Sequence, residues 1–107
     1  MRNVPPITIS LKHWQIIRHI LQKHVPQYEV WAFGSRTQGE VKAYSDLDLA
    51  IITDRPLSIA QSAALDEAFL QSDLPWKVDI VDWATTSVAF RSIIEEQKVV
   101  VQRGKPG

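Results

Sequence analysis

The sequence has 107 residues, of which 45% are hydrophobic, and its 12 basic side chains balance 12 acidic ones. This length and apolar fraction predict one folded domain spanning residues 1–107 rather than a disordered chain. The zero net charge gives no reason to expect direct nucleic-acid or membrane binding, and the absence of cysteine excludes disulfides, a thiolate nucleophile and a cysteine zinc site. No apolar stretch could span a bilayer and no secretory signal pattern is visible, so we expect a cytoplasmic protein.

The first half of the chain is predicted to contain a helix, a strand, a polar loop and a second strand. The helix begins after Ser10, a favourable N-cap, and ends at Pro26. Apolar residues recur along it with helical spacing: Leu11, Trp14, Ile17, Leu21 and Val25. Residues 28–33 and 46–52 are apolar enough to form strands, and the polar segment 36–44 between them is predicted to be a loop.

The second half is predicted to alternate helix and strand. A helix covers residues 58–72, with Ser58 and Gln61 at the spacing of a capping box. Its expected buried residues are Ile59, Ala63, Leu65, Ala68 and Phe69. A strand at 77–81, a third helix capped by Thr85 or Thr86, and a last short strand at 98–102 complete an α/β (α+β) fold in which helices flank a small mixed sheet.

Four tryptophans and one further acid also allow predictions. Trp14 and Trp31 are expected in the core, whereas Trp76 and Trp83 flank the third strand and are candidates for exposed partner contacts. Asp82, at the end of that strand, is expected to be an ordinary surface acid.

Two aspartates in the second strand are the strongest chemical signal. Asp46 and Asp48 project to the same face, about 7 Å apart along the strand. Two like charges side by side are costly unless a cation neutralises them, and oxygen ligands favour Mg²⁺ or Mn²⁺. From this motif alone, a solvated polar strand end explains the pattern equally well.

A third acid and a glycine turn complete the candidate site. Asp79 lies inside an otherwise apolar strand, where it is either a third metal ligand or an ion-pair partner for Lys77. Gly34 and Ser35 close the first strand with a turn whose N–H groups could bind phosphate, and Arg36 could pair with phosphate. The alternative for these three residues is a plain strand-to-loop turn.

The two segments together resemble a known family. Gly-Ser-Arg-Thr-Gln-Gly at 34–39, followed by Ser-Asp-Leu-Asp-Leu at 45–49, is similar to the signature of the minimal nucleotidyltransferase (MNT) family within the polymerase-β-like superfamily. The resemblance implies that Asp46 and Asp48 hold two metal ions and that Asp79 holds the catalytic one. It also implies a nucleotide-binding role for Gly34, Ser35 and Arg36. The chain departs from the family pattern at two places: Thr37-Gln38-Gly39 stands where many members have Ala-Arg-Gly, and Lys42 stands where an arginine is common.

The resemblance further implies a reaction and a partner. A chain of this kind would use two Mg²⁺ ions to transfer AMP from ATP to a tyrosine hydroxyl of a helical HEPN-family RNase toxin, and would act as its antitoxin. Two alternatives are an antitoxin that neutralises the toxin by binding alone, and a nucleotidyltransferase that modifies a small molecule.

Overall fold

The computed structural model describes residues 7, 9–34 and 46–104. The elements follow one another as α1 (Leu11–His24), β1 (Glu29–Phe33), β2 (Leu47–Ile52), α2 (Ile59–Leu70), β3 (Val78–Asp82), the short 3-10 helix η2 (Trp83–Thr85), α3 (Val88–Gln97) and β4 (Val99–Gln102). The predicted order of helices and strands is confirmed, and the predicted loop at 36–44 lies outside the described residues. None of the described helices is long and apolar enough to cross a membrane.

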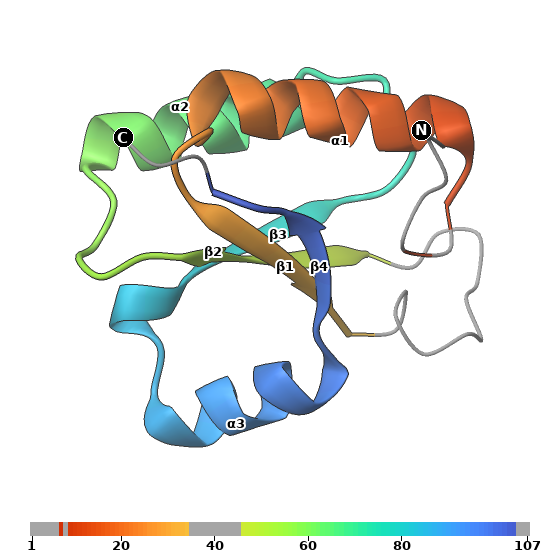
Figure 1. Ribbon diagram of the computed structural model, residues 1–107. Helices are drawn as coiled ribbons and strands as arrows, with labels where there is room; N and C mark the ends of the chain where they lie inside the picture. The colour runs from red at the N-terminus through yellow and green to blue at the C-terminus, as the bar shows by residue number, and fades with distance from the viewer. Residues whose placement is uncertain (1–6, 8, 35–45, 105–107) are drawn as a thin grey trace.

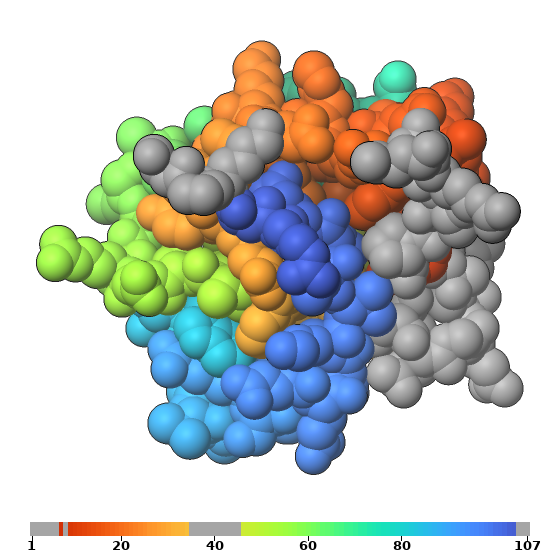
Figure 2. All heavy atoms as spheres, viewed as in Figure 1, coloured from red at the N-terminus to blue at the C-terminus, as the bar shows by residue number. Residues whose placement is uncertain are grey.

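The four strands form one mixed sheet in the order β3-β2-β1-β4. The β1 strand is antiparallel to both β2 and β4, whereas β2 and β3 run parallel. Helices α1 and α2 cover one face of the sheet and α3 covers the other, as Figure 1 shows. In the space-filling view, β4 lies on the front surface between α1 above and α3 below (Figure 2). The predicted fold class, a small mixed sheet flanked by helices, is therefore confirmed.

Successive side chains of β2 point to opposite faces of the sheet, so that one face contributes to the main core and the other carries Asp48. Leu47, Leu49 and Ile51 are fully buried against the α1 and α2 side of the sheet. Ala50 faces the opposite side and joins the smaller cluster that α3 covers with Ile94. Asp48 lies on the same side of the sheet as Ala50, two residues nearer the start of the strand, and is only half-buried.

The buried stripe of α2 is narrower than expected. Its Leu65 and Phe69 are buried, as predicted, but Ile59 is 89% exposed and Ala63 is also exposed. Six residues at about 100° each place Ile59 about 120° away from Leu65 around the helix. Ala68 is partly buried against the core, so the prediction was wrong only for Ile59 and Ala63, which lie outside the stripe formed by Leu65, Ala68 and Phe69.

The helix caps agree in part with the sequence prediction. Ser58 accepts a hydrogen bond from the Gln61 backbone N–H at 3.0 Å, as a capping box requires. The Gln61 side chain does not complete the box, because it donates to the His24 carbonyl at the end of α1 instead. The cap of α3 is Ser87 rather than Thr85 or Thr86.

Asp82 explains the changed cap and is not an ordinary surface acid. Its carboxylate accepts hydrogen bonds from the hydroxyl of buried Thr53, from the Leu57 N–H at 2.7 Å and from the Ala84 N–H at 3.2 Å. The Ala84 bond caps η2, so the chain makes a 3-10 turn before α3 begins. Asp82 thereby joins the segment after β2 to the end of β3.

The tryptophans divide differently from the prediction. Trp14 and Trp31 are buried, as expected. Trp76 is only 9% exposed and packs edge-on against His13 of α1, so the expectation of an exposed side chain was wrong. Trp83 is half-buried against Trp31 and lies beneath the Arg91 guanidinium.

Candidate active site

The register of the sheet makes Asp48 the centre of the candidate site. Asp48 pairs with Phe33 of β1 on one side and with Asp79 of β3 on the other. Neighbouring strands lie about 4.8 Å apart, so the Asp48 and Asp79 carboxylates leave adjacent backbone positions on the same face of the sheet. Asp46 is exposed and lies directly before β2. The structure thus brings the three acids predicted from the sequence into one region.

The electrostatic environment of Asp48 disfavours its charged form. Partial burial raises the pKa of the Asp48 carboxyl, and the nearby charges of Asp79 and then Asp46 raise it further. The negative charge on Asp48 is therefore unfavourable unless the carboxylate binds a proton or lies beside a bound cation.

Asp79 has a cationic neighbour in Lys77, the residue directly before β3. The Lys77 Nζ lies 3.3 Å from Asp79 Oδ1, and the two side chains are 73% and 41% exposed. The ion-pair alternative raised by the sequence is therefore present. Such exposed pairs contribute only about 0–1 kcal/mol, so the pair leaves the Asp79 carboxylate accessible to other partners.

Gly34 closes β1 directly against Asp48. Its backbone has φ of +85°, a left-handed conformation that residues with a Cβ rarely adopt. A Cβ at this position would also collide with the Asp48 carboxylate, whose Cγ would lie only 3.3 Å away. The turn therefore requires glycine for two independent reasons, its backbone conformation and its closeness to Asp48.

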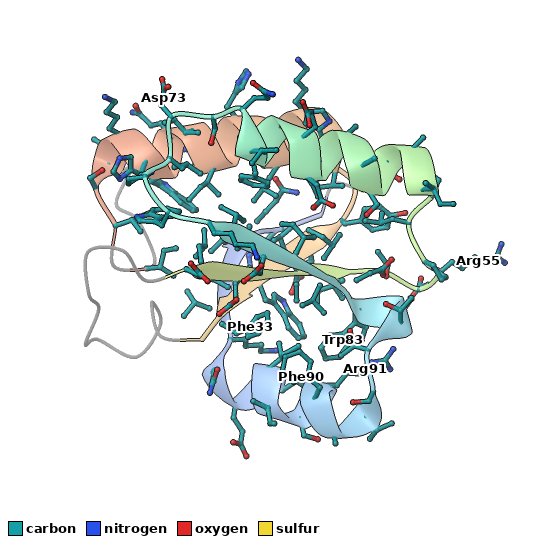
Figure 3. The ribbon with its side chains drawn as sticks, turned by 180° about the vertical axis from the view of Figure 1, so that it is seen from behind. Phe33, Arg55, Asp73, Trp83, Phe90 and Arg91 are labelled. Carbon is teal, nitrogen blue, oxygen red and sulfur yellow. The ribbon has the colours of Figure 1, made fainter. Side chains whose placement is uncertain are left out.

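Gln97 is a site residue that the sequence analysis missed. Its side-chain Oε1, at the end of α3, accepts a hydrogen bond from the Gly34 N–H at 2.9 Å. No motif marks this residue, because the contact joins positions 63 apart in the chain. Figure 3 shows the nearby packing of Phe33 against Phe90, which holds α3 beneath this end of β1. The predicted nucleotide-binding residues Ser35 and Arg36 lie outside the described residues.

The donor atoms suit a hard divalent cation. Within residues 7, 9–34 and 46–104, no group of three His, Cys, Asp or Glu side chains is arranged to enclose a metal ion. The chemistry of the acids nevertheless matches Mg²⁺ or Mn²⁺, since all the candidate ligands are carboxylate oxygens. The raised pKa of Asp48 also indicates negative charge that a cation would neutralise.

Gly34 lies against Asp48, and Asp46 and Asp79 lie nearby on the same small mixed sheet. This arrangement agrees with the family resemblance found in the sequence. The model of the Nucleotidyltransferase domain family matches residues 15–105, and the chain belongs to this family. The probable protein adenylyltransferase MntA of Haemophilus influenzae is 52% identical over 102 residues, which cover 95% of this chain and 90% of the relative. The family resemblance is therefore confirmed.

Solved structures show the same fold. A toxin–antitoxin structure with AMP-PNP superposes with a TM-score of 0.70 at 25% identity, over 86% of this chain and 74% of that chain. A complex of the tri-AMPylated Shewanella oneidensis HEPN toxin with its MNT antitoxin gives a TM-score of 0.67 at 21% identity, over 89% of this chain and 73% of that chain. At that identity, the second match supports the fold alone.

Proposed function

We propose that this chain is a protein adenylyltransferase and an antitoxin. It transfers AMP from ATP to a tyrosine hydroxyl of a HEPN-family RNase toxin, with which it forms a hetero-oligomer in the cytoplasm. The observation that carries this proposal is the contact between Gly34 and Asp48, with Asp79 paired beside Asp48 in the sheet. The similarity to a probable protein adenylyltransferase and to a toxin–antitoxin structure with AMP-PNP supports the same reaction.

Each candidate residue has a distinct role in the proposed reaction. Asp46 and Asp48 would hold two Mg²⁺ ions, for which Mn²⁺ can substitute, and Asp79 would help to hold the catalytic one. Bound there, the ions supply positive charge that stabilises the phosphates. Gly34, Ser35 and Arg36 would bind the triphosphate through backbone N–H groups and the Arg36 guanidinium.

The chemical step is an exchange of bonds at the α-phosphorus. A new bond forms between the acceptor oxygen and the α-phosphorus, the bond to the bridging oxygen breaks, and pyrophosphate leaves. Asp79 accepts the proton of the attacking hydroxyl, since it lies at the open edge of the sheet where an acceptor can approach. Rate enhancement comes mainly from positioning and charge stabilisation, as in other phosphoryl transfers.

Intact mass spectrometry of the co-expressed HEPN partner tests the proposal. With the wild-type chain, we expect the partner to gain mass in whole AMP units, and with the double variant Asp46→Ala/Asp48→Ala we expect no gain. A tight complex in which neither chain adds mass to the partner would instead indicate an antitoxin that works by binding alone.

A further inference from the structure

Gln97 connects the end of α3 to the glycine that lies against Asp48. Its Oε1 accepts a partly buried hydrogen bond from the Gly34 N–H at 2.9 Å. Ala32 of β1 pairs with Val99 of β4, so the antiparallel register places Gly34, two residues later, opposite Gln97, two residues earlier. Asp48 belongs to β2, on the other side of β1. Gly34 therefore has Gln97 on its β4 side and Asp48 on its β2 side.

The packing of α3 fixes the position from which the Gln97 side chain extends. Ile94, almost one turn earlier on the helix, is fully buried in the small core cluster between α3 and the sheet. Phe90, one turn earlier again, packs edge-on against Phe33 with ring centroids 5.7 Å apart. After Gln97 the chain passes through a single residue into β4 (Figure 1). A packed helix and a paired strand thus hold the Gln97 backbone on both sides.

The backbone of Gly34 needs a constraint that its own residue type does not supply. Glycine adopts many backbone conformations with similar energies, so contacts with other residues must select the observed φ of +85°. A Cβ at this position would lie 3.3 Å from the Asp48 Cγ, so the Gly34 backbone runs directly past the carboxylate. Rotation of the Gly34 peptide would therefore change the space that the Asp48 carboxylate occupies.

We propose that Gln97 is a positioning residue for AMP transfer. By holding the Gly34 peptide through its N–H, the Gln97 amide keeps the Asp48 carboxylate in the position that a divalent cation and the reacting phosphate require. The inference rests on the proposed adenylyltransferase function and adds to that site a residue from the end of α3. Gln97 acts through Gly34, and the property that the role requires is an oxygen acceptor at the end of a side chain of this length.

Removal of the acceptor oxygen tests the proposal. Gln97→Met keeps the length of the side chain and loses the amide oxygen, whereas Gln97→Glu keeps an oxygen at the same place. In AMP transfer to the purified partner at saturating Mg²⁺, we expect Gln97→Met to lower kcat at least about tenfold without changing KM for the partner, since misplaced reacting groups slow the chemical step. Gln97→Glu should retain kcat within about threefold of the wild type, because its carboxylate still accepts the hydrogen bond.

Gln102 provides a matched control on the same segment of the chain. It is the last residue of β4, and its Nε2 donates to the carbonyls of Val25 at 2.9 Å and Tyr28 at 3.0 Å, before the start of β1. Gln102→Met therefore also removes hydrogen bonds of a half-buried glutamine, but at the end of β1 away from Gly34. We expect it to lower the thermal unfolding temperature and to leave kcat per folded molecule at the wild-type value.

Three results would overturn the inference: a wild-type kcat in Gln97→Met, an equal loss in Gln97→Glu, or an equal loss in Gln102→Met. Gln97→Asn, whose side chain is one methylene shorter, should repeat the loss if Gln97→Met fails to fold. If the wild-type chain transfers no AMP, the proposed function fails separately. The carboxylate ¹³C NMR signal of Asp48 then tests the connection without substrate. A shift in Gln97→Met that Gln102→Met lacks would support the inference, and an unchanged signal would overturn it.

Discussion

The variant Asp48→Asn is expected to lose AMP transfer at least about 1,000-fold, although the fold remains intact. The loss follows because Asp48 is central to the candidate site. On one side it pairs with Phe33, the residue before Gly34, and on the other side it pairs with Asp79. An amide keeps the shape of the side chain but removes the negative charge that a divalent cation requires. The measurement is AMP incorporation into the purified partner at saturating ATP and Mg²⁺.

The same substitution is expected to stabilise the metal-free protein. Burial, Asp79 and Asp46 raise the pKa of Asp48 above its ordinary value of 3.8. The folded state therefore binds this proton more tightly than the unfolded state does. As pH rises from about 3.8 through the folded-state pKa, the free energy of unfolding falls, and above that pKa the penalty is complete.

Thermal unfolding at neutral pH in EDTA checks this second effect. Asp48→Asn should unfold at a higher temperature than the wild type, and Mg²⁺ should raise the transition of the wild type alone. Asp54→Asn, at an exposed turn position, is the matched control and should resemble the wild type in transfer and in stability. An Asp48→Asn chain that transferred AMP at the wild-type rate would remove Asp48 from the proposed site.

The variant Gly34→Ala is expected to damage both folding and catalysis. The φ of +85° strains any residue with a Cβ, and the added methyl would collide with the Asp48 carboxylate. The strain should lower the free energy of unfolding by about 1–3 kcal/mol. Displacement of Asp48 by about 1 Å should lower AMP transfer about 100-fold, measured per folded molecule.

A second glycine separates the two effects. At Gly104, a Cβ would lie 2.5 Å from the Gln27 carbonyl oxygen, so Gly104→Ala should also destabilise the protein. The Gly104 contact lies at the end of β1 away from Gly34, and AMP transfer per folded molecule should therefore stay near the wild-type value. Equal losses of transfer in the two variants would show that Gly34 acts through general stability and has no specific role beside Asp48.

Elements with strong local signals could be predicted from the sequence. The helix after Ser10 and the alternating β2 strand were identified because apolar periodicity determines which face is buried. The cap of α3 was misplaced because three hydroxyl residues, Thr85, Thr86 and Ser87, precede it. Which of them caps depends on Asp82, whose carboxylate caps the start of η2 and is held by contacts with Thr53 and Leu57 that form only in the fold.

The parts of the candidate site that are close together in the sequence could be predicted, whereas the contacts between distant positions could not. The spacing of Asp46 and Asp48 follows from the strand period alone. The closeness of Asp48 to Asp79 depends on the register of two parallel strands, which the spacing of the motifs does not determine. The bond between Gly34 and Gln97 depends on where α3 ends, and neither residue type indicates the other.

Transfer of radioactive phosphorus from ATP to the purified partner is the most direct test of the central claim, that this chain transfers AMP through its cluster of aspartates. ATP is labelled either at the α-phosphate or at the γ-phosphate, and the wild-type chain is compared with Asp48→Asn. We predict that the α-label becomes attached to the partner only with Mg²⁺ and the wild-type chain, and that the γ-label leaves with pyrophosphate. Attachment of the γ-label, or equal attachment of the α-label by Asp48→Asn, would contradict the account.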